Sequence, residues 1–262
     1  MILRLVLLFL MFTSSYAKES NWYDGIDVKL EAGLFLSDYD GTVSNPNSKL
    51  SFKDDLGYSS TTSSNLGLEF KFPYEYMPNI ALNYFNMKQN RDSNISTPFE
   101  VIGVEMTTPI TSRIDYRVLN TKIHQEFKRK GKRQRMYGFI FYPGDIEFDV
   151  GINIKVIDYL FQVKPSAESD DSYRFESVRS ITYLPHIGVK YYRYDLSLYA
   201  NISALSLSSA KAKNYQYGVI YKVIDNLYID IGYMYEDFQA TEKRDSINFK
   251  TSGYKYSFKY AF

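Results

Sequence analysis

Hydrophobic and polar residues alternate along most of this chain from Asp24 onward. The regular segments are 26–36, 65–72, 146–156, 195–202, 215–223 and 227–235. Successive side chains of a β-strand point to opposite faces, so each segment has one apolar and one polar face. The sequence shows no helical stripe of comparable length. The pattern therefore predicts an all-β protein.

The connections between these segments alternate in length. The short ones are 73–78, 107–111, 142–145, 192–195 and 224–226, and the longer ones are 37–64, 88–97, 128–135, 160–178, 207–211 and 240–246. Short turns on one side and longer loops on the other are typical of outer-membrane barrels, and we expect about twelve strands, with ten or fourteen as alternatives. Both termini are expected on the short-turn side. Segments 99–106 and 112–124 are the least regular.

The first seventeen residues have the pattern of a secretory signal peptide. Arg4 precedes the apolar run 5–12, and Ser15-Tyr16-Ala17 supplies small residues at a cleavage site. We expect residues 1–17 to be removed and 18–262 to form a single barrel domain. No later segment has the ~18 consecutive apolar residues of a spanning helix, so a membrane crossing would have to use strands.

The composition is rich in tyrosine, with Tyr 26, Phe 18 and Trp 1. Many of these rings lie at the short turns, as in the aromatic girdle of a barrel at the membrane interface. With no cysteine, the chain has neither disulfides nor thiolate metal sites. A formal net charge of +1 gives no global electrostatic reason to expect nucleic acid.

The C-terminal residues form a row of alternating aromatic side chains. They are Tyr254, Tyr256, Phe258, Tyr260 and Phe262. A last strand of this kind resembles the signal read by the outer-membrane barrel insertion machinery, the alternative being an ordinary edge strand. With the signal peptide and the loop lengths, it favours a closed antiparallel up-and-down transmembrane β-barrel over a soluble sandwich. We expect a monomer in the cell outer membrane, in contact with its lipids.

Several short motifs resemble an uncharacterised family of outer-membrane β-barrel proteins of Gram-negative bacteria. They are Leu30-Glu31-Ala32-Gly33, Asp54-Asp55-Leu56-Gly57, Met77-Pro78-Asn79, the segment 142–155, Tyr183-Leu184-Pro185 and Ile231-Gly232-Tyr233. The resemblance covers most of the mature chain, although each motif alone is common in barrels. It implies the fold and the compartment, and it brings no catalytic residues.

The polar faces of the strands predict a lumen lined by charges of both signs. The residues expected there are Lys29, Glu31, Glu69, Lys71, Arg113, Asp115, Arg117, Glu147, Asp149, Lys155, Asp230, Glu236, Lys255 and Lys259. Mixed charges across a narrow lumen tend to pair, because unpaired buried charge is costly. Two functions remain open: a narrow non-selective solute channel, or a plugged structural or partner-binding barrel without transport.

A basic segment stands out between two predicted strands. Its charged residues are Lys128, Arg129, Lys130, Lys132, Arg133 and Arg135. Like charges repel and stay solvated, so a solvated hairpin tip is one interpretation. The other is an extracellular loop that contacts lipopolysaccharide phosphates, which suit Arg and Lys. Nucleic acid is not expected.

No catalytic constellation is predicted. Only His124 and His186 are available as histidine bases, and the sequence has no Gly-x-Ser-x-Gly elbow. Two histidines so distant in sequence make a poor metal site, and we expect both to be structural. We therefore expect no enzyme activity, metal or cofactor, with a lipid-modifying enzyme as a remote alternative.

Overall fold

The structure is a computed structural model of the 262-residue chain. It describes residues 25–44, 49–74, 77–95, 98–101, 104–106, 109–131, 134–136, 139–141, 144–169, 172–206, 210–242 and 245–262. The predicted signal peptide, residues 1–17, lies outside the described residues. In the described ranges there is no helix whose length and hydropathy would let it cross a bilayer.

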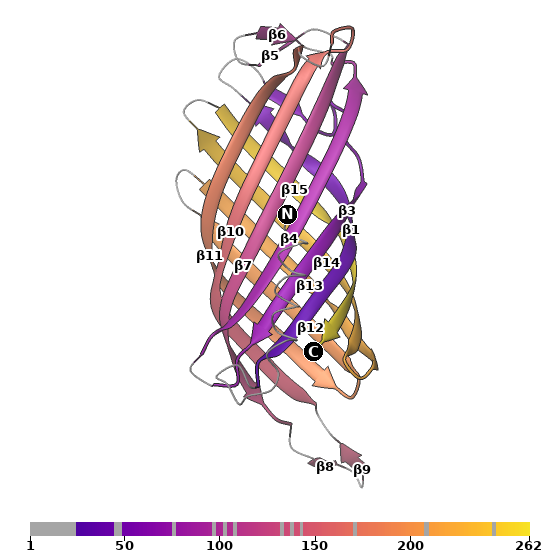
Figure 1. Ribbon diagram of the computed structural model, residues 1–262, viewed down its shortest axis with the longest axis vertical. Helices are drawn as coiled ribbons and strands as arrows, with labels where there is room; N and C mark the ends of the chain where they lie inside the picture. Colours follow the sequence, from indigo (N-terminus) through magenta and orange to yellow (C-terminus); the bar gives the residue numbers. More distant parts are fainter. Residues whose placement is uncertain are drawn as a thin grey trace, which may run out of the picture.

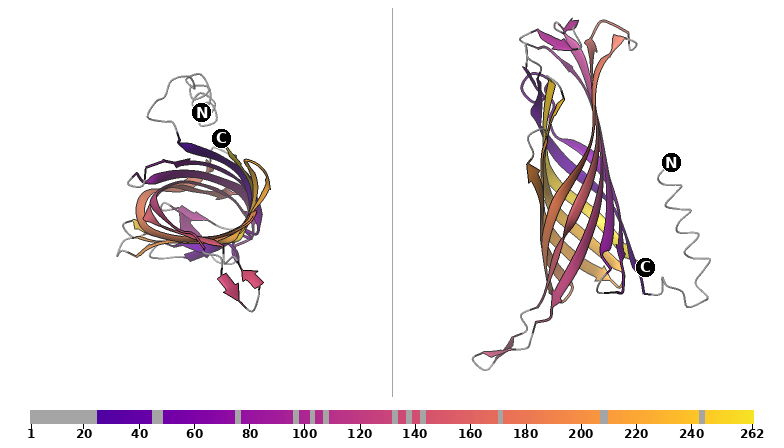
Figure 2. Two further views of the ribbon diagram at one scale, coloured as in Figure 1. Left: turned by 90° about the horizontal axis from the view of Figure 1, so that it is seen from below. Right: turned by 90° about the vertical axis from the view of Figure 1, so that its left-hand side faces the viewer.

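Ten long antiparallel strands form a closed barrel (Figure 1). They are β1 (Asp27–Ser44), β3 (Thr61–Lys71), β4 (Asn79–Ser93), β7 (Ile110–Arg129), β10 (Asp145–Pro165), β11 (Arg174–Arg193), β12 (Leu196–Ser206), β13 (Ala210–Ile224), β14 (Leu227–Glu242) and β15 (Asp245–Ala261). Consecutive long strands are neighbours, and β15 pairs with β1 from Lys29↔Ala261 to Ser44↔Ser246. Figure 2 shows the resulting ring from below. The predicted up-and-down barrel is confirmed, with ten strands, one of the alternatives, in place of twelve.

Five short strands lie outside the ring of ten. β2 (Lys49–Ser51) extends the edge of β1 beyond β3. β5 (Phe99–Val101) pairs with β6 (Val104–Met106), and β8 (Gln134–Met136) pairs with β9 (Phe139–Phe141). Both hairpins lie at the ends of the barrel (Figure 1), so these segments do not contribute wall strands.

The start of β1 and the end of β15 define one end of the barrel, the terminal end, and the opposite end is the far end. The terminal end carries the start of β1, the end of β15 and the turns 194–195 and 225–226. Asn226 adopts the left-handed conformation (φ 68°) that a two-residue hairpin requires and that asparagine tolerates. The far end carries the ends of β1, β4, β10, β12 and β14 and the starts of β3, β7, β11, β13 and β15.

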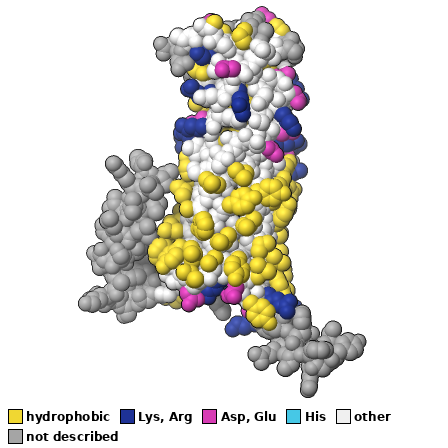
Figure 3. Space-filling model, turned by 90° about the vertical axis from the view of Figure 1, so that its right-hand side faces the viewer, with side chains coloured by type: hydrophobic (Ala, Val, Ile, Leu, Met, Phe, Trp, Pro, Cys, Tyr) yellow, Lys and Arg dark blue, Asp and Glu magenta, His cyan; other side chains and the backbone are white. Residues whose placement is uncertain are grey.

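A band of apolar side chains surrounds the half of the barrel nearer the terminal end. Figure 3 shows these side chains gathered on one face, with charged side chains beyond them toward the far end. Phe148, Val150 and Ile152 of β10 are exposed apolar residues, whereas Asp158 is the exposed residue farther along the same face. A bilayer-crossing β-strand needs about 9–11 residues. Because β10 has 21 residues, about half of it extends beyond the band.

Inside the barrel, the lining changes from polar to apolar side chains at the level where the outer apolar band ends. On β10 the inward residues change from Asp149, Asn153 and Lys155 to Ile157 and Tyr159. Beyond this level the lumen is filled by an aromatic plug, all of whose members are at most 3% exposed: Phe35, Tyr39, Phe52, Tyr58, Tyr116, Tyr159, Phe161 and Phe249. The far half is therefore built like a soluble protein, with its apolar side chains inside.

Candidate functional site in the barrel lumen

The structure places all but three of the charged residues predicted for the lumen on the inward face. The inward ones are Lys29, Glu31, Glu69, Lys71, Glu147, Asp149, Lys155, Asp230, Glu236, Lys255 and Lys259. They lie between the aromatic plug and the terminal end, on β1, β3, β10, β14 and β15. Sequence phasing missed Lys122, His124 and Glu126, which also face inward from β7.

Arg113, Asp115 and Arg117 lie on the outer wall, so their predicted lumenal position is wrong. Arg117 donates a hydrogen bond from Nε to Asp115 Oδ1 (2.9 Å), and Lys88 Nζ lies 3.2 Å from Asp115 Oδ2. The intervening Tyr116 is fully buried in the plug. The prediction assumed a polar lumen along the whole of β7, whereas beyond the apolar band the polar residues face outward into water.

The lumenal charges in the described residues form four groups of ion pairs, one of which joins Lys122 to Asp149. At the terminal end, Lys71 Nζ lies 2.6 Å from Glu126 Oε1 and Lys128 Nζ 3.3 Å from Glu147 Oε2.

In the second group, Lys255 Nζ lies 2.9 Å from Glu31 Oε1 and 2.9 Å from Asp230 Oδ2, and Lys259 Nζ lies 2.8 Å from Asp230 Oδ2. In the third, Lys155 pairs with Glu236, which also accepts a hydrogen bond from Tyr116 (3.0 Å). Buried charge is tolerable here because each carboxylate has a cationic partner.

The two histidines, far apart in sequence, lie close together in the lumen. Their ring centroids are 6.5 Å apart, and Gly151 of β10 is the cross-strand partner of both. His124 lies toward the terminal end of β7. Because β7 and β11 both flank β10, the closed sheet supplies a proximity that sequence spacing cannot show.

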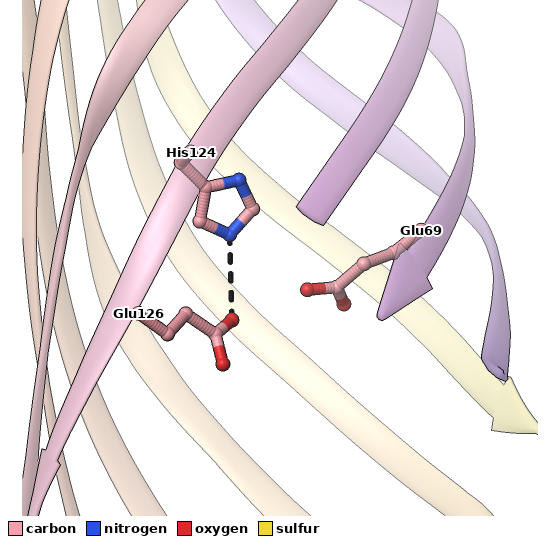
Figure 4. A group of neighbouring side chains, drawn as sticks. All are labelled: Glu69, His124 and Glu126. Carbon is pink, nitrogen blue, oxygen red and sulfur yellow. Dashed lines mark hydrogen bonds and ion pairs between the residues drawn. The ribbon is translucent and has the colours of Figure 1, made fainter. Parts of the chain in front are cut away.

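His124 belongs to a group that resembles a metal site. Figure 4 shows it with Glu69 and Glu126, and one ligand atom from each residue lies within 4.8 Å of the others. An imidazole with two carboxylates suits a divalent ion. However, the Lys71 ammonium lies 2.6 Å from Glu126 and 3.8 Å from Glu69. A lysine already supplies the positive charge there, so the group is an ion-pair cluster and we assign no metal.

His186 belongs to a second hydrogen-bonded set. Its Nε2 lies 2.5 Å from Asp149 Oδ1, and its Nδ1 lies 2.8 Å from Ser203 Oγ. A nucleophile, a base and an orienting carboxylate are thus in line. Acyl transfer also needs donors aimed at the developing oxyanion. Ser203 lies within β12, whose backbone hydrogen-bonds to β11 and β13, so these strands leave no pair of backbone N–H groups for that role.

A polar cavity of about 150 Å³ lies between the plug and the terminal end. Ammonium groups, carboxylates and many carboxamides line it. The carboxamides are Asn65, Asn83, Asn120, Asn153, Asn201, Asn214 and Gln216. A water molecule occupies about 30 Å³ in the liquid, so this volume corresponds to about five waters.

The basic segment lies at the terminal end, so its prediction as an extracellular loop opposite the termini is wrong. β7 runs from the far end to Arg129, and Lys130 follows it as an exposed residue. Lys128 belongs to β7 and Arg135 to β8, while Lys132 and Arg133 lie outside the described residues. The error came from counting 99–106 as a wall strand, which reversed the direction assigned to β7.

The C-terminal aromatic row lies on the outer face of the apolar band. Tyr254, Tyr256, Phe258 and Tyr260 alternate along β15 and Phe262 follows it, all of them exposed. This position suits contact with lipid. Recognition by the insertion machinery stays a prediction.

These features define the class of protein. A closed sheet pairs the backbone groups of the wall strands, as hydrocarbon demands, and an apolar band on the outside with charges inside is the reverse of a soluble barrel. The chain is an integral β-barrel of the bacterial outer membrane, of Gram-negative type.

No protein-family model matches the sequence, and a search of curated proteins found no match. Similar solved structures include the outer membrane protease OmpT from Escherichia coli (10% identity, 94% of this chain and 99% of that chain, TM-score 0.48). Another is the translocator domain of the autotransporter NalP from Neisseria meningitidis (10%, 95% and 92%, TM-score 0.42). Neisserial surface protein A is a third (10%, 91% and 97%, TM-score 0.34). These values are too low to transfer a function or a site.

Proposed function

We propose that this protein is a closed, non-conducting outer-membrane barrel that holds its far half above the membrane as a binding surface. The aromatic plug carries the proposal. The rings of Tyr116 on β7 and Phe249 on β15 come from different sides of the barrel, and their centroids are 4.3 Å apart. Rings that meet across the lumen at this distance leave no path for water or solutes. We expect no enzyme activity and a monomeric state.

The loop between β2 and β3 strengthens the closure. Phe52 packs against Phe161 and Phe249 with centroid distances of 6.0 and 6.3 Å. The Tyr58 hydroxyl donates a hydrogen bond to Ser112 Oγ (3.0 Å), and Ser93 Oγ donates one to the Leu56 carbonyl (2.7 Å). The loop is thus tied to the barrel wall while its rings fill the mouth.

Planar-bilayer conductance tests the closed state. We expect the purified wild-type protein to give no discrete conductance steps. The double variant Tyr116→Ala/Phe249→Ala removes the rings that meet across the lumen, and a leak gained by it shows that the assay detects an open barrel. Regular steps from the wild type would overturn the proposal and favour a narrow solute channel, the second candidate, which the polar cavity supports.

For the binding surface we propose lipopolysaccharide as a partner of the outer wall just beyond the apolar band. Lys88 and Arg117 lie there around Asp115, and Arg179 is exposed at the same height, opposite Asp158 in the sheet. Guanidinium and ammonium groups suit phosphate. Replacing Lys88, Arg117 and Arg179 by glutamine should reduce the lipopolysaccharide phosphate that co-purifies with the protein. An unchanged amount would contradict this contact.

The orientation in the membrane can be tested with single cysteines, because the chain has none of its own. Barrels of this class have short periplasmic turns, so the terminal end should face the periplasm. In intact cells, a membrane-impermeant maleimide should label Lys213→Cys in the far half and should not label Lys130→Cys. The opposite result would invert the barrel.

A further inference from the structure

Lys29 is a lumenal cation whose cross-strand partner is Glu69, with which it forms no direct ion pair. It lines the polar cavity from β1 and forms no ion pair or hydrogen bond with any residue that the structure describes. Two more ammonium groups at the cavity have only long contacts: Lys122 Nζ lies 3.7 Å from Asp149, and Lys190 Nζ 3.5 Å from Glu147. A charge removed from water is costly unless it is paired. The three ammonium groups line the cavity from β1, β7 and β11, on different sides of the barrel, and together they call for an anion.

The cavity also contains hydrogen-bond acceptors without donors, on β7 and β10. Asn120 Oδ1 and Asn153 Oδ1 are buried and have no hydrogen-bond partner, and both residues line the cavity. Asn153 is only 7% exposed and is the cross-strand partner of Lys122. Buried carbonyl oxygens are normally satisfied, so an occupant of this cavity should present hydroxyl groups to them.

We propose that the cavity binds a small polyhydroxylated organic anion, of the class of sugar acids and sugar phosphates. The acid group would lie among the ammonium groups of Lys29, Lys122 and Lys190. The hydroxyl groups would donate to Asn120 and Asn153. The cavity volume of about 150 Å³ limits the ligand to the size of a monosaccharide or less.

Access has to come from the terminal end, because the aromatic plug closes the other. There the path crosses the ion pairs of Lys71 and Lys128 with Glu126 and Glu147. The Lys128 side chain is 62% exposed, so this boundary is hydrated and a lysine can move aside without opening an apolar core. The ligand would thus be taken from the periplasm. This inference does not depend on the proposed surface function.

Isothermal titration of the purified full-length barrel tests the site, with glucuronate and glucose 6-phosphate as probes. Glucose, acetate and inorganic phosphate are the controls that lack either the acid or the hydroxyls. We expect at least one of the two probes to bind, more weakly at high salt. The stronger probe tells whether the acid group is a carboxylate or a phosphate. No binding of either probe, or equal binding of acetate or inorganic phosphate, would overturn the proposal.

Lys29→Met is the decisive variant because it breaks no ion pair in the described structure. Probe binding should weaken by about tenfold or more, the usual contribution of a hydrogen bond between charged groups. The melting temperature without a probe should not fall. Lys222→Met is the matched control, since Lys222 pairs with Asp225 at the exposed turn and should leave binding unchanged. Wild-type affinity in Lys29→Met, or a lower melting temperature, would refute the assignment.

Discussion

Replacing Phe249 by alanine removes the ring at the centre of the aromatic plug. Phe249 is fully buried, and its ring centroid lies 4.3 Å from that of Tyr116, 5.8 Å from that of Tyr39 and 5.8 Å from that of Tyr159. A buried Phe→Ala change costs about 3–5 kcal/mol. Each lost aromatic pair adds roughly 0.5–1.5 kcal/mol to simple burial, so we expect the upper part of that range. The far half should lose most of its rigidity.

Urea unfolding of the barrel, refolded into lipid vesicles, measures the loss. The midpoint should fall while the slope with urea stays constant, because the surface exposed on unfolding hardly changes. Phe258→Ala is the control, since Phe258 lies on the same strand with 62% of its surface exposed toward lipid. Its removal leaves no enclosed cavity, so it should cost only about 1–2 kcal/mol. If Phe249→Ala cost no more than Phe258→Ala, the plug would not be a packed core.

Three further substitutions test the interior. Lys155→Met leaves the buried Glu236 carboxylate without its cationic partner, so it should lower the free energy of unfolding by about 3–5 kcal/mol. Adding Glu236→Gln should recover part of that loss. Gly188→Ala places a Cβ 2.5 Å from the Asp149 carboxylate, and overpacking of this kind costs about 1–3 kcal/mol by urea titration. Burial raises the pKa of Tyr58 above its ordinary value of 10.0. The folded state then holds the phenolic proton more tightly, so stability is complete below pH 10.0 and falls as the pH rises beyond it. Melting curves of Tyr58→Phe should show a smaller alkaline loss, and equal losses would contradict this cause.

The strand alternation was sufficient to predict the barrel and most of its lumen. The phase assigned to β1, β3, β10, β14 and β15 matches the structure, because their apolar rows begin within the apolar band. The segment 99–106 misled the strand count for a different reason. Its two halves are β-strands, but they pair with each other at the far end and not with the wall. Local pattern shows that a strand forms, and it does not show which strand becomes its partner.

β7 was assigned wrongly because its inward face changes chemistry along its length. Tyr116 and Val118 are inward and apolar, whereas Lys122 and His124 are inward and polar. A rule that makes each face of a strand polar or apolar over its whole length must therefore misplace the charged residues at one end of β7. The sequence could not predict that the two histidines lie close together, since this depends on both β7 and β11 pairing with β10.

The change of the inward face from apolar to polar is nevertheless visible in the sequence. On β7 it falls between the adjacent apolar residues Val118 and Leu119, and on β10 between Val156 and Ile157. One member of each pair faces inward and the other outward, so the apolar row changes face at that point. The register pairs Leu119 with Val156, which places both marks at one height. On β7 and β10 an apolar doublet therefore marks the edge of the apolar band that faces the far end.

The different linings of the lumen on the two sides of that edge also limit its possible functions. On the far side of it the interior is a packed aromatic core, and on the near side it is a hydrated set of charges and carboxamides. A solute crossing the protein would have to displace rings that meet from different sides of the barrel. A ligand entering from the terminal end meets polar side chains and ion pairs, among them the exposed Lys128 and the buried Glu147. The geometry thus favours binding at the terminal end over passage through the barrel.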